Sequence, residues 1–339
     1  MRTNVNQYSP QSDNEISLID EYNREFSYLR LSITDVCNYR CNYCLPDGYE
    51  SCSDEKELSL EEIKTLVTHF ADMGIKKVRI TGGEPGTRSD LPLIIKTVKS
   101  IPGIETVALT TNGYKLNKRI NSWVEAGLDA INVSIDSLRP EMFNLITGHD
   151  RLDEILMGLN TAIKLGMTSV KVNAVLLKSY NLNQFDEFLK WIKDKPISLR
   201  FIELMETSDN TEFFEQNHVR GEDILERLKQ NNWQEKTRNK HSGPAREFYH
   251  ELYQGQIGLI MPYSPDFCNT CNRLRISARG KLHLCLFGET GYDLRPLLSP
   301  NKVHSLNDHI KDILKNKSVS HFLHMRQTGA TKHLAMLGG

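Results

Sequence analysis

The sequence lacks any long apolar run. No stretch approaches the roughly 18 consecutive apolar residues that indicate a membrane-spanning helix. The N-terminus is polar and acidic, without the basic start and apolar stretch of a secretory signal peptide. We therefore expect no membrane segment. The seven cysteines of the 339-residue chain would then stay reduced, which predicts a cytoplasmic protein without a disulfide framework.

The chain also has no excess of charge of either sign. Its 42 Lys and Arg residues against 43 Asp and Glu residues give a formal net charge of −1. Such a balance provides no global attraction to nucleic acid or to anionic lipid, so we predict neither as a partner. An anionic ligand would have to be bound by a local cluster of cations.

A fourth ligand is missing from the first of two cysteine groups. Cys37, Cys41 and Cys44 form a tight set, and no other Cys or His lies between Asp35 and Cys52. Electron-carrying [4Fe–4S] centres use four cysteines, and structural zinc sites use four Cys or His ligands. Three thiolates can bind three irons of a four-iron cluster and leave the fourth iron open for chemistry. The spacing favours such an open cluster, with zinc as the alternative.

The second cysteine group also has three members. Cys268, Cys271 and Cys285 are followed by no further cysteine. His283 could complete a Cys3His zinc site, so spacing alone leaves zinc and an iron–sulfur cluster open here. Cys52 lies outside the spacing of the first group, and we interpret it as a free thiol.

Six short β-branched runs alternate with helical patterns between the two cysteine groups. Ser59 and Glu62 have the spacing of a capping box before the first apolar stripe. Six strand–helix units predict a parallel sheet with right-handed crossovers. Because a closed barrel of this kind has eight units, we predict an α/β fold, a partial (open) TIM-type (β/α)6 barrel. The expected strands are at about 28–33, 78–81, 106–111, 130–135, 169–176 and 198–204.

Composition and the alternation of strand and helix patterns divide the chain into three parts. Residues 1–26 are polar and aperiodic, which predicts a mobile tail. Residues 27–243 would form the barrel. The alternation stops near Gly243 and Pro244, so we expect a C-terminal domain over 244–339 that carries the second cysteine group, with β-like runs at about 246–252, 256–261, 273–277 and 281–286.

Cations alternate with apolar residues along three of the predicted barrel strands and in the second cysteine group. Arg79 and Lys171 lie in such strands, and Arg273 and Arg275 share one parity. Arg30 alternates in the same way in the first strand. If helices cover the apolar faces, these cations point inward, where an unpaired charge is costly. An anionic substrate would explain them, and arginine suits phosphate. Pairing with Asp35, Glu84, Asp136 or Glu203 is the alternative.

Polar motifs lie in the predicted strands or directly after them, and parallel barrels place their active sites at the strand ends. They are Thr-Gly-Gly-Glu-Pro at 81–85, Thr-Thr-Asn-Gly at 110–113, Ile-Asn-Val-Ser at 131–134 and Arg-Phe-Ile-Glu at 200–203. Together with both cysteine groups and the terminal Gly-Gly, the chain resembles the GTP 3′,8-cyclase family, molybdenum cofactor biosynthesis protein A. This family belongs to the radical S-adenosylmethionine (SAM) superfamily. The resemblance covers residues from about 27 to the C-terminus.

The resemblance implies a chemistry. Both cysteine groups would hold [4Fe–4S] clusters, and SAM bound to the first would be cleaved to a 5′-deoxyadenosyl radical. That radical would take hydrogen from C3′ of GTP, and the carbon radical would attack C8 of guanine. Further reduction of the resulting radical would give 3′,8-cyclo-7,8-dihydro-GTP. This lyase reaction would be the first step of molybdenum cofactor (molybdopterin) biosynthesis. Cyclic pyranopterin monophosphate synthase would act downstream. An external electron donor and a homodimer are also implied.

The resemblance also assigns residues. His283 would not be a ligand of the second cluster, and the C-terminal glycines would enter the active-site region. SAM would contact Tyr43, Gly83, Ser134 and Met205, GTP would contact Arg30, Arg79, Thr110, Lys171, Arg273 and Arg275, and the tail is Gly338 and Gly339.

Two rival functions remain, and three histidines are set aside. The nearer rival is another radical SAM enzyme with an auxiliary cluster, acting on a substrate such as a peptide. The more distant rival is a non-enzymatic zinc protein or electron carrier. We expect His321, His324 and His333 to be solvated.

Overall fold

A computed structural model describes residues 17–50, 55–238, 243–299 and 301–338. Its main element is a mixed sheet of twelve strands in the order β14-β13-β12-β3-β4-β5-β6-β7-β8-β11-β10-β9. The six central strands are parallel and agree with the predicted runs to within about two residues, which confirms the strand–helix alternation. Their bounds are β3 Tyr28–Ser32, β4 Lys77–Thr81, β5 Thr106–Thr111, β6 Ala130–Ser134, β7 Ser169–Leu176 and β8 Ser198–Glu203.

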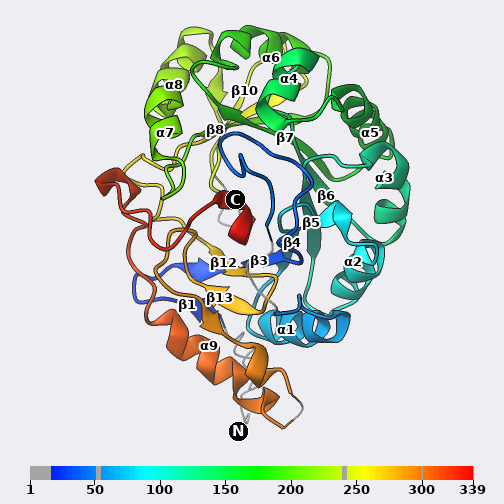
Figure 1. Ribbon diagram of the computed structural model, residues 1–339, viewed down its shortest axis with the longest axis vertical. Helices are drawn as coiled ribbons and strands as arrows, with labels where there is room; N and C mark the ends of the chain where they lie inside the picture. The colour runs from blue at the N-terminus through cyan, green and yellow to red at the C-terminus, as the bar shows by residue number, and fades with distance from the viewer. Residues whose placement is uncertain (1–16, 51–54, 239–242, 300, 339) are drawn as a thin grey trace, which may run out of the picture.

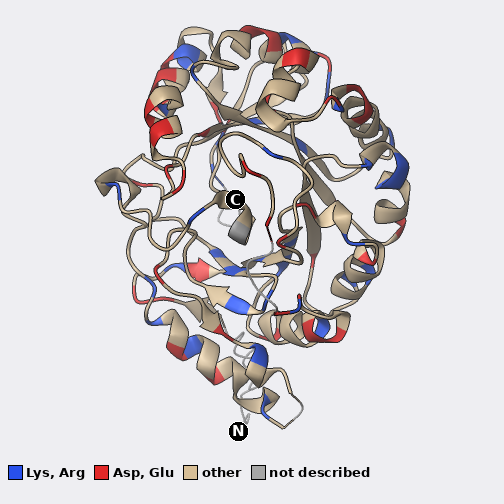
Figure 2. Cartoon of the chain, in the orientation of Figure 1, with Lys and Arg blue, Asp and Glu red and all other residues tan. Residues whose placement is uncertain are grey.

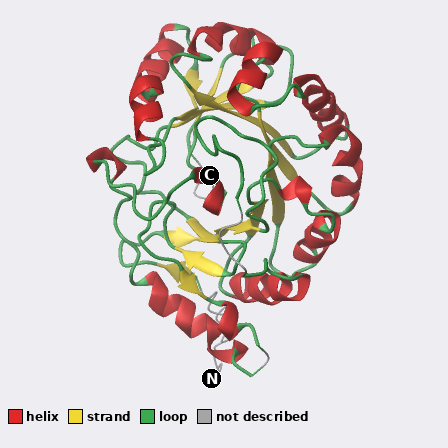
Figure 3. Ribbon diagram, viewed as in Figure 1, coloured by secondary structure: helices red, strands yellow, loops and turns green. Residues whose placement is uncertain are grey.

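Helices line the outer side of this curved sheet (Figures 1 and 3). The first of them begins as predicted, because the Ser59 hydroxyl accepts from the Glu62 amide at 3.3 Å and the Glu62 carboxylate accepts from the Ser59 amide at 2.8 Å. Among the residues that the structure describes, no helix is both long and apolar enough to span a bilayer. The α-helices are α1 Leu60–Asp72, α2 Leu91–Lys99, α3 Leu116–Glu125, α4 Pro140–Thr147, α5 Leu152–Lys164, α6 Phe185–Ile192, α7 Thr211–Asn217, α8 Gly221–Gln230 and α9 Leu306–Leu314.

The C-terminal strands extend both edges of the central sheet. Strand β12 (Arg273–Ile276) pairs in parallel with β3, and β11 (Gln256–Ile260) pairs in parallel with β8. The register places Arg275 beside Arg30, and Arg30 in turn beside Arg79. Three arginines from distant parts of the chain therefore form one row across three strands. The remaining strands of this sheet are β9 Gln234–Glu235, β10 Arg246–Tyr249, β13 Lys281–His283 and β14 Tyr292–Asp293.

The N-terminal segment differs from the expectation. Residues 1–16 lie outside the described part of the chain, but residues 17–26, predicted as tail, form a hairpin of β1 (Leu18–Ile19) and β2 (Glu25–Phe26). Leu18 and Phe26 are each only 1% exposed and belong to the main core. Two-residue strands are too short for their alternation to be visible in a sequence dominated by polar residues.

Candidate active site

The first cysteine group lies in the loop that follows β3. Cys37, Cys41 and Cys44 form no disulfide and line one cavity of about 150 Å³. The amide of Cys44 donates to the carbonyl of Cys41 at 2.9 Å, so the loop folds back on itself and brings these two cysteines together. This packing places three thiols around one space.

The electrostatic environment of these thiols disfavours free thiolates. Burial, and then the nearby carboxylate of Asp136, raises the pKa of the Cys41 thiol well above its usual value. Burial and the Cys37 thiol raise the pKa of Cys44 to about 12. A cationic iron centre would reverse this penalty, because a coordinated thiol is deprotonated. No three His, Cys, Asp or Glu side chains of the described residues converge as ligands of a single metal ion would. The observation that supports a cluster is that all three cysteines line one cavity.

All four residues assigned to SAM line this first cavity: Tyr43, Gly83, Ser134 and Met205. Gly83 packs directly under the cysteine loop, and a Cβ atom there would lie 2.4 Å from the carbonyl oxygen of Val36. No side chain fits at that distance. The Gly-Gly turn therefore allows the backbone after β4 to approach the cysteine loop.

Two buried carboxylates, Asp136 in the lining of the first cavity and Glu84 outside it, hold the loops around this cavity. Asp136 accepts from the Tyr43 hydroxyl at 2.9 Å and from the Val175 amide at 2.8 Å, and burial raises its pKa to about 6. Glu84 accepts from the Thr111 hydroxyl at 2.7 Å and from the Asn112 amide at 2.6 Å, and burial raises its pKa to about 7. Both carboxylates position the loops around the site.

The predicted partners of the inward cations are engaged elsewhere. Besides Glu84 and Asp136, Asp35 forms an ion pair with Arg279 at 3.0 Å, and Glu203 pairs with His218 at 2.9 Å. The alternative that these four carboxylates pair with the inward cations is therefore wrong. Lys171 pairs instead with Glu247 of β10, at 3.6 Å. Strand β10 reaches the sheet through β11, and the pairing of β11 with β8 is long-range. The alternation of residues along a single strand cannot identify such a partner.

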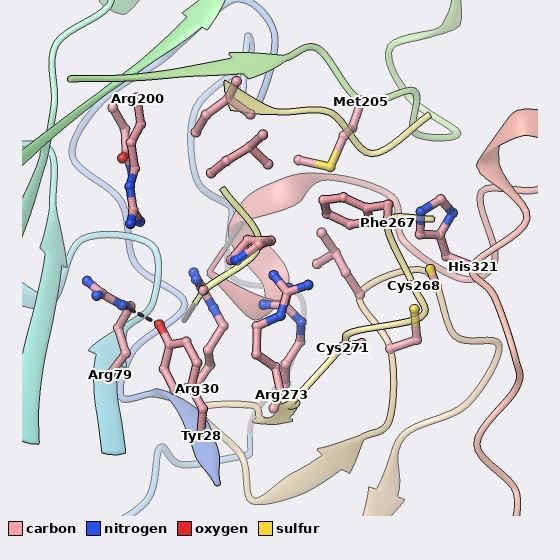
Figure 4. A pocket seen from close by; sticks show the side chains of 18 of the residues that line it. Tyr28, Arg30, Arg79, Arg200, Met205, Phe267, Cys268, Cys271, Arg273 and His321 are labelled. Carbon is pink, nitrogen blue, oxygen red and sulfur yellow. Dashed lines mark hydrogen bonds between the residues drawn. The ribbon is translucent and has the colours of Figure 1, made fainter. Parts of the chain in front are cut away.

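A second cavity of about 320 Å³ lies next to the first. Cys268, Cys271 and Cys285 line it, and Figure 4 shows the first two. Seven basic side chains also line it, whereas Glu247 is the one carboxylate among its described lining residues. The basic residues are Arg30, Lys77, Arg79, Lys171, Arg200, Arg273 and Arg275.

The crowding of cations is visible in their pKa values. Burial and then Arg275 lower the pKa of Arg30 to about 9, and burial and then Arg200 lower the pKa of Lys171 to about 8. Tyr28 shows the reverse, because burial would raise its pKa but Arg79 and other cations lower it to about 7. Its hydroxyl is hydrogen-bonded to Arg79 (Figure 4). Figure 2 shows both signs of charge on the outer helices and basic stretches on inner strands, among them β3. An anion in this cavity would relieve the repulsion.

The two cavities adjoin and share three lining residues, Asn173, Ile202 and Met205. The last described residues of the chain lie near the centre of the view in Figure 1. Gly338 lines the first cavity, and its carbonyl accepts a hydrogen bond from Arg30. Its φ of +62° favours glycine, and a Cβ atom there would lie 2.3 Å from the Thr81 hydroxyl. Gly339 lies outside the described residues.

Some assigned residues lie elsewhere, and some lining residues were missed. Thr110 lines the first cavity rather than the second, although its hydroxyl accepts from Arg79 at 3.2 Å. Tyr28 and Lys77 line the second cavity and share the parity of Arg30 and Arg79, so extending the alternation by one step would have found them. Arg200 also lines the second cavity, and the sequence marks it only as part of the Arg-Phe-Ile-Glu motif.

The histidines divide into three cases. His283 does not line the second cavity, and its ring lies 2.5 Å from where a Cβ of Gly291 would be. His321 is 7% exposed and lines the second cavity, so the prediction that it is solvated is wrong. The chain packs it against Phe267 and Phe287. His324 is exposed and His333 is half-buried. Cys52 lies outside the described residues.

Comparison with known proteins decides the family. The radical SAM superfamily matches residues 31–192, and the Molybdenum Cofactor Synthesis C family matches residues 197–323. GTP 3′,8-cyclase of Psychromonas ingrahamii is 54% identical over 323 residues, which are 95% of each chain. The chain belongs to the GTP 3′,8-cyclase family. The enzyme of Vibrio parahaemolyticus is 53% identical over 94% of this chain and 97% of its own, and that of Actinobacillus pleuropneumoniae serotype 5b is 51% identical over 97% of both.

Membership makes the chain a radical SAM lyase of molybdenum cofactor biosynthesis and implies one [4Fe–4S] cluster and SAM. The solved structures that resemble it include Streptococcus suis SuiB bound to S-adenosylmethionine, with a TM-score of 0.60 and 15% identity over 86% of this chain and 69% of SuiB. SuiB bound to its precursor peptide SuiA has a TM-score of 0.57 and 16% identity over 86% of this chain and 68% of its own. At this identity the likeness shows the α/β radical SAM fold alone.

Proposed function

We propose that this protein is a GTP 3′,8-cyclase that converts GTP to (8S)-3′,8-cyclo-7,8-dihydroguanosine 5′-triphosphate. One observation carries the proposal: two adjoining cavities each present three cysteines, and the second is lined by seven basic side chains. The first cavity suits a cluster and SAM, and the second suits an anionic nucleotide close to it. The family relationship supplies the identity of the reaction.

The first cavity would hold the catalytic cluster and SAM. Cys37, Cys41 and Cys44 would bind the [4Fe–4S] cluster, and SAM would lie against Tyr43, Gly83, Ser134 and Met205. The cluster and SAM would supply the radical chemistry on the ribose of GTP, for which the protein provides placement and shielding. The protein contributes a loop whose backbone is fixed by the Gly83 turn and a phenol fixed by Asp136.

The second cavity would hold an auxiliary [4Fe–4S] cluster together with GTP. Cys268, Cys271 and Cys285 line it and are not disulfide-bonded, whereas His283 does not line it. This arrangement supports a three-cysteine cluster over a Cys3His zinc site. We propose that the guanine lies near this cluster.

The basic side chains would position the triphosphate. We assign this role to Arg30, Arg79, Lys171, Arg273 and Arg275 and add Lys77 and Arg200, which line the same cavity. Thr110 would act through Arg79. Arginine can donate two parallel hydrogen bonds to a phosphate. Orientation matters because a misplacement of about 1 Å can cost on the order of 10²-fold in rate.

We further infer that the curved sheet is the open, partial (β/α)6 barrel of this superfamily, extended at both edges by the C-terminal strands. The polar ends of β3 to β8 and the tail around Gly338 would then close its mouth. The contact between Gly338 and Arg30 supports this role of the tail.

The remaining partners follow from the chemistry. One-electron reduction of the clusters needs an external donor, and the reactive product suits a downstream cyclic pyranopterin monophosphate synthase. The six described cysteines form no disulfide, which supports a reducing compartment such as the cytoplasm. The family resemblance supports a homodimer.

Anaerobic turnover tests the proposal. The full chain, reconstituted with iron and sulfide, is incubated with SAM and a strong reductant, with and without GTP, and small molecules are analysed by mass spectrometry. We expect GTP-dependent 5′-deoxyadenosine together with a cyclised guanosine triphosphate. Deoxyadenosine with unchanged GTP would retain the radical chemistry and reject the substrate. Absence of both products from iron-loaded protein would reject the whole proposal.

A further inference from the structure

Three polar contacts, one of them fully buried, reach the second cysteine group from residues that do not line the second cavity. Lys317, 5% exposed, donates from its ammonium group to the carbonyl of Leu284, the residue before Cys285. The Ser320 hydroxyl lies 3.7 Å from the Cys268 sulfur. The Arg24 guanidinium donates to the Cys268 carbonyl at 3.3 Å. Two of the three cysteines are therefore contacted, directly or through a neighbour.

The N-terminal hairpin holds these contacts in place. Arg24, 6% exposed, donates to the carbonyls of Ser318 at 2.7 Å and Val319 at 2.8 Å. Its own charge is balanced by Asp20, whose carboxylate lies 2.6 Å from the Arg24 Nε atom. The Phe26 ring lies 5.3 Å from the Lys317 ammonium nitrogen. The hairpin thus contacts the segment 317–319 at each of its three residues.

The two cysteine groups differ in their surrounding charge. Around the first group, the carboxylate of Glu84 acts on Cys37 and that of Asp136 acts on Cys41. Around the second group, the cations Arg273 and Lys317 act on Cys271. The first group is therefore faced by carboxylates and the second by cations.

We propose that Lys317 makes the auxiliary cluster easier to reduce, and that Arg24 with the hairpin positions Lys317 and the Cys268 loop for this purpose. The proposal rests on the proposed function, because it needs a cluster at the second cysteine group. A reduced cluster carries one more negative charge than an oxidised one. A buried cation beside it stabilises the reduced state, and net charge and solvent exposure are among the factors that set such potentials.

The test is a redox titration of the full chain with both clusters, followed by electron paramagnetic resonance, with SAM added to separate the signal of the first cluster. In Lys317→Gln the side chain keeps a donor for the Leu284 carbonyl and loses its charge. We expect the ratio of reduced to oxidised auxiliary cluster at a fixed potential to fall about tenfold, as removal of a nearby buried charge predicts. The first cluster should titrate unchanged.

Lys315→Gln is the matched control. Lys315 lies two residues away with its side chain 68% exposed, and it pairs with Asp312 at 2.7 Å. Solvent screens such a charge, so neither cluster should shift. An unchanged auxiliary potential in Lys317→Gln, or an equal shift of both clusters, would overturn the proposal.

Further variants keep the test decisive. If Lys317→Gln does not retain the auxiliary cluster, Lys317→Arg must restore it with the parental potential. If neither variant holds the cluster, Lys317 acts only in packing, and its electrostatic role is rejected. Arg24→Ala should lose iron and sulfide from the second site while the first site stays loaded, and retention at the second site would reject the positioning role.

Failure of the proposed function has a different signature. If the unaltered chain, fully loaded, contains iron and sulfide for one four-iron cluster only, then no auxiliary cluster exists to be tuned. Two clusters with an unresponsive potential would instead reject the role of Lys317 alone.

Discussion

Replacing Lys171 by alanine tests the role of the second cavity most directly. Lys171 lies on β7 with 21% of its side chain exposed, and its ammonium nitrogen is 3.6 Å from the Glu247 carboxylate. Burial, opposed in part by Glu247, lowers its pKa to about 8, so the side chain is mostly charged at pH 7. In the proposed function this charge binds a phosphate of GTP.

The expected loss follows from an exchange of partners. A hydrogen bond to a charged group contributes about 1.5–3 kcal/mol. Because Lys171 already has Glu247 as a partner, GTP gains only the difference between the two contacts, and we take the lower end of the range. About 1.5 kcal/mol corresponds to a roughly tenfold increase in the Kd of GTP.

The assay is equilibrium binding under anaerobic conditions, with GTP and SAM measured on the same loaded protein. Lys171→Ala should weaken GTP and leave SAM unchanged. Lys164→Ala, an exposed lysine at the end of α5, should change neither. Unchanged GTP affinity in Lys171→Ala would refute the assignment, and equal loss of both ligands would indicate a folding defect instead.

Glu247→Gln should have the opposite sign. The Glu247 carboxylate also lies 3.1 Å from Arg200, so its neutralisation makes the cavity more positive. We expect GTP to bind a few-fold more tightly. The double variant should not be additive, because residues in one ion-pair network couple by about 0.5–3 kcal/mol. Strict additivity would show that Lys171 does not exchange Glu247 for phosphate.

Three further outcomes follow from the site. Gly83→Ala should prevent loading of the first cluster, because its Cβ would lie 2.4 Å from the Val36 carbonyl, and normal iron content there would contradict this packing argument. Deletion of Gly338 and Gly339 should reduce turnover while both clusters stay loaded, since Gly338 contacts Arg30; unaffected turnover would remove the tail from the site. GTP affinity should fall as pH rises through about 7, because Tyr28, with its pKa lowered to about 7, then becomes an anion in the cavity. Tyr28→Phe should reduce this pH dependence of GTP binding. An identical pH profile for the variant would refute the role of Tyr28.

The sequence determined the elements and most of the candidate ligands. Hydrophobic periodicity located the six central strands, and the Ser59 capping box located the start of α1. These are local signals, since capping and alternation depend on neighbouring residues. Alternation also placed Arg30, Arg79 and Lys171 on one face, and the structure has all three lining one cavity. Cysteine spacing identified both groups of three.

Only the tertiary structure decided which residues surround the cations and the cysteines. Parallel pairing of β12 with β3 brings Arg275 beside Arg30, and β10 brings Glu247 to Lys171, across separations that no local pattern encodes. Burial of His321, the short N-terminal hairpin and its contacts with the Cys268 loop arise in the same way. Residues distant in the chain meet because the sheet is extended at both edges, and charge, burial and cavity shape depend on those meetings rather than on sequence spacing.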